Sequence, residues 1–140
     1  MCYVFLTREK ADRAKARIAK HAPELLCQVA RAVACGNENA ARLIAAQTLT
    51  ARANGTLIAK KAEIDLLLRL AGTSQILEAI RKAGCRNNDR TLLIAAGSDR
   101  SVRKLLAMRD IGGRRLRSGP LTTKEKMMIE NAAVLSALRA

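Results

Sequence analysis

The stretch that decides the fold is NGTLIAKKAEIDLLLRLAGTSQILEAIRKAG, which runs from Asn54 to Gly84. Apolar residues recur in it twice at i, i+3, i+4 and i+7: Ile64, Leu67, Leu68 and Ala71, then Ile76, Ala79, Ile80 and Ala83. This spacing places the apolar residues of each half on one face of a helix. Gly72 and Gly84 stand where left-handed C-caps are expected, and Thr73 and Ser74 offer a cap for the second helix. The stretch therefore predicts two short helices that pack as a pair.

Short apolar runs outside this pair predict a small sheet. Cys2 to Leu6 is rich in β-branched and aromatic residues, and Thr91 to Ala96 is an apolar run between polar neighbours, typical of an interior strand. Leu26 to Ala30 is interpreted as a buried strand, although its periodicity does not decide between strand and helix. The Gly- and Arg-rich loop from Ile111 to Pro120 has room for a brief strand at Arg115 to Arg117.

Further helices are predicted around the pair, at Arg8 to Lys20, Asn39 to Ala53, Ser98 to Met108 and Thr122 to the C-terminus. The helix from Asn39 to Ala53 is apolar on nearly every face, so we expect it to be the most buried one. Thr122 and Glu125 have the spacing of a capping box. Strands and helices alternate without a repeat or a long linker. The sequence therefore predicts one compact α+β domain over residues 1–140, with a small mixed sheet covered by several helices.

The composition limits the core and the compartment. Apolar residues make up 49% of the 140 residues, but the chain has one Tyr, one Phe and no Trp, so the core must consist of Leu, Ile, Val and Ala. No apolar run approaches the roughly 18 residues that a membrane-spanning helix needs. The opening MCYVFL is too short for the apolar region of a signal peptide. We therefore expect a cytoplasmic protein.

Residues in catalytic or metal-binding patterns are scarce. His21 is the only histidine, and it has no nucleophile or carboxylate in a recognisable motif beside it. The four cysteines contain no C-x-x-C pair, which argues against a zinc site and favours small buried side chains. A disulfide among Cys2, Cys27, Cys35 and Cys85 remains open. The sequence predicts no catalytic residue, no metal and no cofactor, and therefore no enzyme.

The strongest compositional signal is the formal net charge of +14. The segment from Arg81 to Lys126 alone holds thirteen Lys or Arg against four acids. Such an excess has two explanations: a solvated surface, or a surface that binds a polyanion through its phosphates. RNA is the natural polyanion for such a chain. We expect the phosphates to contact a group of cations around the two short helices, namely Lys60, Lys61, Arg69, Arg81 and Lys82. Gly112-Gly113, which precedes Arg114 and Arg115, forms either a phosphate-binding loop or a plain turn.

The last helix has more apolar circumference than one core contact requires. Polar residues leave only a narrow strip of it, so the helix is either buried on two sides or faces a partner with its second side.

The sequence of Asn54–Gly84 resembles that of the archaeal members of one family, the small kinase-binding subunit of the KEOPS (EKC) complex. The animal member of this family is known as TPRKB. The residues that carry this likeness are Lys60, Lys61, Glu63, Leu67, Leu68, Arg69, Leu70, Gly72, Thr73, Gln75, Ile76, Ala83 and Gly84. The likeness extends to Asn39–Ala53 and Thr91–Gly97 and ends in a C-terminal helix that contains Ala and Leu.

This resemblance implies a regulatory subunit without catalytic activity, which acts in threonylcarbamoyladenosine modification of tRNA. Members bind and stimulate the atypical kinase/ATPase subunit, and through it serve the catalytic threonylcarbamoyl transferase subunit. Archaeal members bind the 3′ CCA end of tRNA. We therefore expect tRNA contacts at Lys60, Lys61, Arg69, Arg81, Lys82, Arg114 and Arg115, and kinase-docking contacts at Met128, Ile129, Ala133, Leu135 and Leu138.

Two other functions stay open. One is an unrelated basic RNA-binding or ribosome-associated module, and the other is a structural adaptor whose charge only keeps it in solution. Single-strand recognition usually stacks bases on aromatic rings, and this chain has only Tyr3 and Phe5, both in the first predicted strand. Contacts to a CCA end must therefore rely on Arg planes, backbone groups and apolar side chains.

Overall fold

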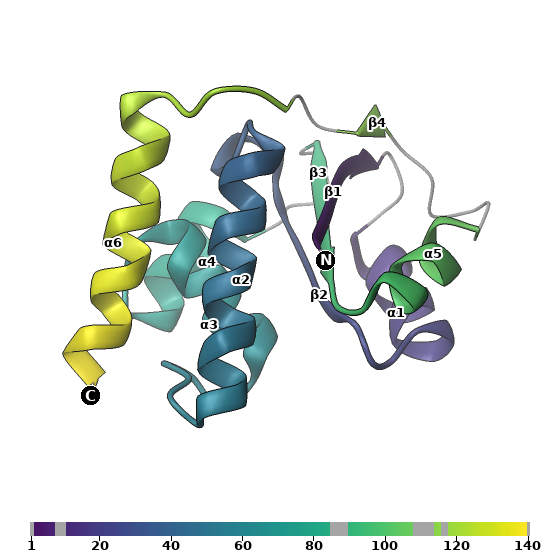
Figure 1. Ribbon diagram of the computed structural model, residues 1–140, viewed down its shortest axis with the longest axis horizontal. Helices are drawn as coiled ribbons and strands as arrows, with labels where there is room; N and C mark the ends of the chain where they lie inside the picture. Colours follow the sequence, from purple (N-terminus) through teal and green to yellow (C-terminus); the bar gives the residue numbers. More distant parts are fainter. Residues whose placement is uncertain (1, 8–10, 85–89, 108–113, 116–117, 140) are drawn as a thin grey trace.

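The computed structural model describes residues 2–7, 11–84, 90–107, 114–115 and 118–139. The chain order is β1 (Cys2–Thr7), α1 (Ala11–His21), β2 (Leu26–Arg31), the 3-10 turn η1 (Ala32–Ala34), α2 (Glu38–Asn54), α3 (Ala62–Ala71), α4 (Ile76–Ala83), β3 (Thr91–Ala96), α5 (Asp99–Leu106), β4 (Arg114–Arg115) and α6 (Thr123–Arg139). Helices lie on both sides of the strands (Figure 1). The predicted α+β class is confirmed.

The strands form a four-stranded sheet in the order β2-β3-β1-β4. β3 pairs antiparallel with β1 on one side and with β2 on the other, where Leu26 faces Ala96 and Arg31 faces Thr91. β1 and β2 therefore run in the same direction, with β3 inserted between them. The strands predicted at Leu26 and at Thr91 are both confirmed, and they pair with each other. Every described pairing is antiparallel, so the sheet is not the mixed one that we expected.

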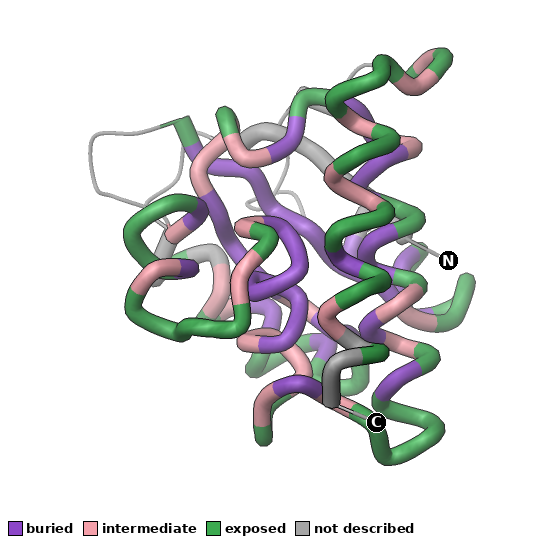
Figure 2. The backbone as a smooth tube through the Cα atoms, turned by 90° about the vertical axis from the view of Figure 1, so that its left-hand side faces the viewer, coloured by how far each residue is buried: buried purple, intermediate pink, exposed green. Residues whose placement is uncertain are grey.

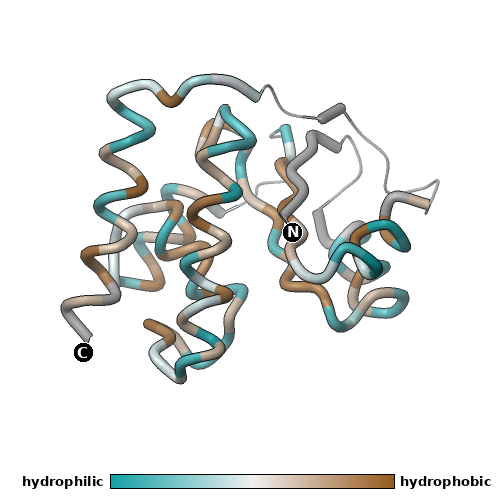
Figure 3. Tube along the Cα trace, viewed as in Figure 1, coloured by the Kyte–Doolittle hydropathy of each residue, from teal (hydrophilic) through white to brown (hydrophobic). Residues whose placement is uncertain are grey.

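All six residues of β3 are buried because helices cover both faces of the sheet (Figure 2). Leu92, Ile94 and Ala96 belong to a core that they share with residues of α2, α3, α4 and α6. Leu93 and Ala95, which point to the other face, belong to a second core formed with α1 and α5. Figure 3 shows apolar segments along β2 and β3, between the two helical layers. A strand that is buried on both faces reads as a continuous apolar run, as this one does.

Local sequence signals set most helix ends. The Asn37 side chain caps α2 by accepting a hydrogen bond from the Asn39 N–H at 2.8 Å, and the Ser98 hydroxyl caps α5. Before α6, the Thr122 N–H donates to Glu125 Oε1 at 3.0 Å and the Glu125 N–H donates to Thr122 Oγ1 at 3.1 Å. The predicted capping box is thus confirmed.

Two predictions about caps need correction. Gly72 has a left-handed φ of 70°, as expected, but Gly84 is extended with a φ of −64°. Gly84 is needed for space instead, because a Cβ there would collide with the Ile80 carbonyl oxygen. The N-cap residue of α4 is Gln75, and Thr73 contributes by accepting a hydrogen bond from the Gln75 N–H.

The most buried helix is α3 rather than α2. Six consecutive α3 residues, from Asp65 to Leu70, are buried, whereas α2 exposes one side that includes Leu43 and Thr50. α3 is enclosed by β2, α2, α4 and α6, whereas α2 packs on β1, β3, α3 and α6 with its remaining side open to solvent. The large apolar side chains of α2 that face the core are Ile44, which is fully buried, and Leu49, which is half-buried.

Candidate functional surfaces

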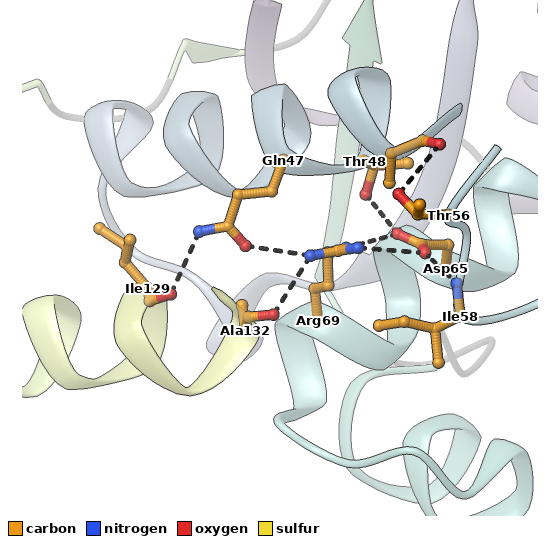
Figure 4. Close-up of polar contacts among 9 residues, drawn as sticks. Gln47, Thr48, Thr56, Ile58, Asp65, Arg69, Ile129 and Ala132 are labelled. Atoms are coloured by element: carbon orange, nitrogen blue, oxygen red, sulfur yellow. Dashed lines mark hydrogen bonds and ion pairs between the residues drawn. The ribbon is translucent and has the colours of Figure 1, made fainter. Parts of the chain in front are cut away.

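A charged pair lies in the middle of the helices that cover the α2 side of the sheet. Asp65 and Arg69, one turn apart on α3, are both 0% exposed, and Arg69 Nε lies 2.5 Å from Asp65 Oδ1. The Thr48 hydroxyl of α2 donates to the same oxygen at 2.7 Å (Figure 4). The backbone N–H of Ile58 donates to Asp65 Oδ2 at 2.8 Å. These partners offset the cost of removing the carboxylate and the guanidinium from water.

Arg69 also holds α6 in place. Its Nη1 donates to the Ala132 carbonyl oxygen at 3.2 Å and to Gln47 Oε1 at 3.3 Å. Gln47 of α2 donates in turn to the Ile129 carbonyl oxygen at 3.2 Å. The prediction that Arg69 contacts tRNA is therefore wrong, because its side chain is held in a buried network. An Asp four residues before an Arg inside a run of leucines was the sequence signal for this pair.

The other predicted cations around α3 and α4 gather at one edge of the sheet. The Gln28 side chain of β2 donates to the Glu63 carbonyl oxygen, in the first turn of α3, at 2.8 Å. Two residues along, Ala30 forms a β-bridge with Gly84, directly after α4. The start of α3 and the end of α4 therefore both lie beside β2, an edge strand. The exposed residues that flank these two points are Lys60, Lys61, Arg81 and Lys82. We call these four residues the edge cluster.

A cation from the opposite layer reaches the same strand. Lys15 Nζ of α1 donates to Gln28 Oε1 at 3.4 Å. On α4, Lys82 Nζ lies 2.9 Å from Glu78 Oε1, and the hydrogen bonds from Lys82 and Thr73 lower the pKa of that carboxyl. The β2 edge is thus bordered by cations from α1, from the segment before α3 and from α4.

The remaining predicted tRNA contacts stay predictions. Arg114 and Arg115 form β4, which pairs with Phe5 and Leu6 of β1, but their side chains are outside the described part of the chain. Gly112-Gly113 lies outside the described residues altogether.

The outer side of α6 is open to solvent. This helix packs on α2 and α3, and Ala132 is its one buried residue among those described. Exposed and half-buried stretches alternate along it (Figure 2). Of the two interpretations that the sequence allowed, burial on two sides within this domain is therefore excluded for the described part of the helix. The second side is exposed.

The predicted docking residues divide between the two sides of α6. Met128, Ile129 and Leu135 are half-buried and pack against the core. Ala133 is exposed, and the side chain of Leu138 is not among those described. The large apolar side chains that do face solvent on α6 are Met127, which is 56% exposed, and Val134, which is 53% exposed. The predicted docking set thus missed the two large apolar side chains that α6 exposes among those described, since only packing reveals which side of a helix faces solvent.

An open hollow of about 440 Å³ lies between α2 and α6. Leu43, Ala46 and Thr50 line one wall, and Ile129 and Ala133 line the other, with Arg69 also reaching the lining. Two predicted docking residues therefore border a concave, largely apolar surface. Such a surface accepts an apolar side chain from a partner.

Two cysteine thiols, those of Cys27 and Cys35, have raised pKa values. Cys27 and Cys35 are free thiols. Burial raises the pKa of the Cys27 thiol to about 12. The Lys15 ammonium lowers this pKa by a smaller amount, and the Glu63 carboxylate raises it further. Burial also raises the pKa of Cys35, whose thiol donates to the Asn37 carbonyl oxygen at 3.3 Å. Cys85 lies outside the described residues and the side chain of Cys2 is not among those described, so a disulfide between these two stays open.

Metal-binding clusters and membrane-spanning helices are both absent from the described residues. No group of three or more His, Cys, Asp or Glu side chains among them is placed to hold a metal ion. None of the helices in that part of the chain has the length and apolar character needed to cross a membrane.

Comparison with known proteins adds no relative. No protein-family model matches the chain, and no curated protein matches it.

Proposed function

We propose that this protein is a non-catalytic subunit of the KEOPS type, which binds tRNA and docks on a kinase/ATPase subunit during threonylcarbamoyladenosine modification. Through that subunit it serves the transferase that carries out the modification. The resemblance of Asn54–Gly84 motivates the proposal. Those residues form the α3–α4 pair, so the likeness falls on one structural unit rather than on scattered segments.

The observation that carries the RNA-binding part is the edge cluster. Lys60 and Lys61 are separated from Arg81 and Lys82 by about twenty residues of chain, yet both pairs flank β2. Four exposed cations at one edge bind the phosphates of a polyanion by releasing its counterions. The formal charge of +14 favours the same kind of partner.

The docking part rests on α6. This helix lies at the periphery of the fold and exposes two large apolar side chains, Met127 and Val134. A partner that docks on α6 removes their apolar surface from water. Burial of such side chains stabilises an interface by on the order of 1–3 kcal/mol each. The hollow beside Ile129 and Ala133 offers a separate apolar surface, on the flank of α6 that faces α2.

The RNA-binding part is tested by reversing the edge cluster in the variant K60E/K61E/R81E/K82E. We expect weaker binding to every tRNA and a shallower dependence of log affinity on log salt, because fewer counterions are released. The matched control is R42E/R52E/K124E/K126E, which reverses the same number of cations on α2 and α6. If both variants lose affinity equally, net charge rather than the edge cluster binds the RNA.

Two further comparisons separate this function from its alternatives. A tRNA transcript without its CCA end should bind more weakly than the full transcript, and equal affinities would contradict CCA recognition. Val134→Glu should prevent co-elution with the kinase/ATPase subunit in gel filtration, since a buried unpaired charge is costly. Ala19→Glu, at an exposed position of α1, is the control. A wild-type chain that binds RNA but never the kinase would instead favour an unrelated RNA-binding module.

A further inference from the structure

The positive charge of the helices is concentrated in one layer. α1 holds four Lys or Arg and one Asp, and α5 holds three Lys or Arg and one Asp. The 19 residues of these two helices therefore carry a net charge of +5. The 52 residues of α2, α3, α4 and α6 hold eight Lys or Arg against six acids, a net charge of +2. The charge density of the α1–α5 layer is therefore several times that of the other layer.

Apart from Lys15, which reaches β2, the cations of both helices lie on the side away from the sheet. On α1, Arg13, Arg17 and Lys20 follow the spacing i, i+4, i+7, which aligns them in one stripe. Arg13 and Lys20 are exposed, whereas Ile18 on the opposite side is 1% exposed.

α5 repeats this arrangement with Arg100, Arg103 and Lys104, all three of them exposed. Its apolar residues Val102 and Leu105 are buried in the same core as Ile18. The two helices therefore lie on the same face of the sheet, and Figure 1 shows them together on the side opposite α6. We call the residues Arg13, Arg17, Lys20, Arg100, Arg103 and Lys104 the outer basic face.

We propose that the outer basic face binds the phosphate backbone of double-helical RNA, independently of sequence. This inference rests on the proposed function, because it assigns a second contact surface for the same tRNA. α1 and the edge cluster border the same strand, since Lys15 of α1 donates to Gln28 of β2 and Gln28 donates to the Glu63 carbonyl oxygen at the start of α3. One RNA can therefore lie against both surfaces, its helical part on α1 and α5.

The composition of the face selects this ligand over a lipid surface. Among the described side chains, none of the large exposed hydrophobic residues lies on α1 or α5. A helix that lies in a membrane interface needs an apolar side to insert, and here that side is buried against the sheet. The face is left with charge alone, which suits a phosphate backbone.

The same composition favours a duplex over a single strand. α1 and α5 contain no Phe, Tyr or Trp, so the face offers no platform on which unpaired bases could stack. Double-stranded RNA is recognised mainly by shape and by contacts to phosphate and 2′-hydroxyl groups. Cations in two stripes meet that requirement without any base contact.

The face also holds two acids, Glu24 and the exposed Asp99 of α5. Glu24 lies in the turn after α1 and, together with Arg100, Ser101 and Lys104, lines a hollow of about 450 Å³. A hydrogen bond from its own backbone, one from Ser101 and the charge of Lys104 lower the pKa of the Glu24 carboxyl. A phosphate that approached this hollow would be repelled by Glu24, so the residue offers a test in the direction of tighter binding.

The experiment measures binding of an RNA hairpin with no single-stranded 3′ end, alongside full tRNA, for three variants. R100Q/R103Q/K104Q removes three cations from the face, and R52Q/K124Q/K126Q removes three cations from the other layer as the control. Glu24→Gln removes the acid that lines the hollow. Circular dichroism checks that each variant is folded.

We expect only R100Q/R103Q/K104Q to weaken hairpin binding. Three lost phosphate contacts lower the slope of log affinity against log salt by about 2.7, so between 50 and 200 mM salt the wild-type affinity should fall roughly 40-fold more than that of the variant. Glu24→Gln should tighten binding, which a merely destabilised fold would not do.

Several results would overturn this inference. One is a wild-type chain that does not bind the hairpin, and another is an equal loss of hairpin affinity in the two triple variants. A third is that R100Q/R103Q/K104Q abolishes binding to anionic phosphatidylserine vesicles while its binding to the hairpin stays unchanged. If R100Q/R103Q/K104Q binds tRNA normally while the edge-cluster variant does not, the outer basic face fails and the proposed function stands. If the wild-type chain binds neither tRNA nor hairpin, the RNA-binding part of the proposed function fails as well.

Discussion

Replacing Arg69 by Met separates a structural role of this residue from a role in RNA binding. Methionine fills much of the space of the Arg stem but donates no hydrogen bond. The substitution removes both Arg69 contacts to Asp65, the 3.3 Å bond to Gln47 and the 3.2 Å bond to the Ala132 carbonyl oxygen. Asp65 keeps only its bonds from Thr48 and Ile58. A buried carboxylate then remains without its cation.

The expected destabilisation is large. Removing one partner of a buried ion pair costs about 3–5 kcal/mol, because the other charge stays buried and uncompensated. For a domain of this size, 1 kcal/mol shifts the melting temperature by about 3 °C, so Arg69→Met should melt about 10–15 °C below the wild type. Denaturant unfolding followed by circular dichroism measures the free energy directly. Hydrogen exchange should accelerate first in α6, since Arg69 holds its Ala132 carbonyl group.

The double variant D65N/R69M is the matched control. The amide introduced by Asp65→Asn keeps an acceptor for the Ile58 N–H and can donate to the Thr48 hydroxyl, while no buried charge is left. The double variant should therefore recover a large part of the lost stability, and the double-mutant cycle gives the coupling between the two residues. Arg69→Met should also bind RNA with an unchanged salt slope at temperatures where it is folded. A loss below 1 kcal/mol, or a salt slope lowered by about one unit, would refute the buried structural role.

Two further predictions concern a thiol and a glycine. At pH 8 the Cys27 thiol, with its pKa of about 12, should react with iodoacetamide about a thousandfold more slowly than a thiol with a pKa of 9.0, because a much smaller fraction of it is thiolate. Peptide-resolved mass spectrometry would compare its rate with that of a reference cysteine in Ala16→Cys. Equal rates would mean that the site opens freely. Gly84→Ala should destabilise the domain by roughly 1–3 kcal/mol, because its Cβ meets the Ile80 carbonyl group. Gly36→Ala, where nothing lies within 4 Å of the added Cβ, should be neutral or slightly stabilising in the same urea titration, and similar losses in both variants would argue against the collision.

Most secondary-structure elements could be predicted from the sequence because their signals are local. The apolar spacing within Asn54–Gly84 depends only on the helical repeat, and the capping box of Thr122 and Glu125 depends on neighbours three residues apart. The run from Thr91 to Ala96 is apolar throughout and became the central strand. Gly84 escaped the same reasoning, since glycine suits both a left-handed turn and a close approach, and only the packed backbone shows which is needed.

The sequence by itself determined that the chain has a Leu, Ile, Val and Ala core, that it is strongly basic, and that it alternates short strands with helices. It did not determine which charges face solvent. Arg69 lies four residues after Asp65, and the layers that close over α3 turn this pair into a buried network. Tertiary structure also brought Lys60 and Lys61 to the strand beside which Arg81 and Lys82 lie, and placed the cations of α1 and α5 on one face. The physical reason is that periodicity fixes which residues share a face of their own helix, while the packing of distant segments decides which face is covered.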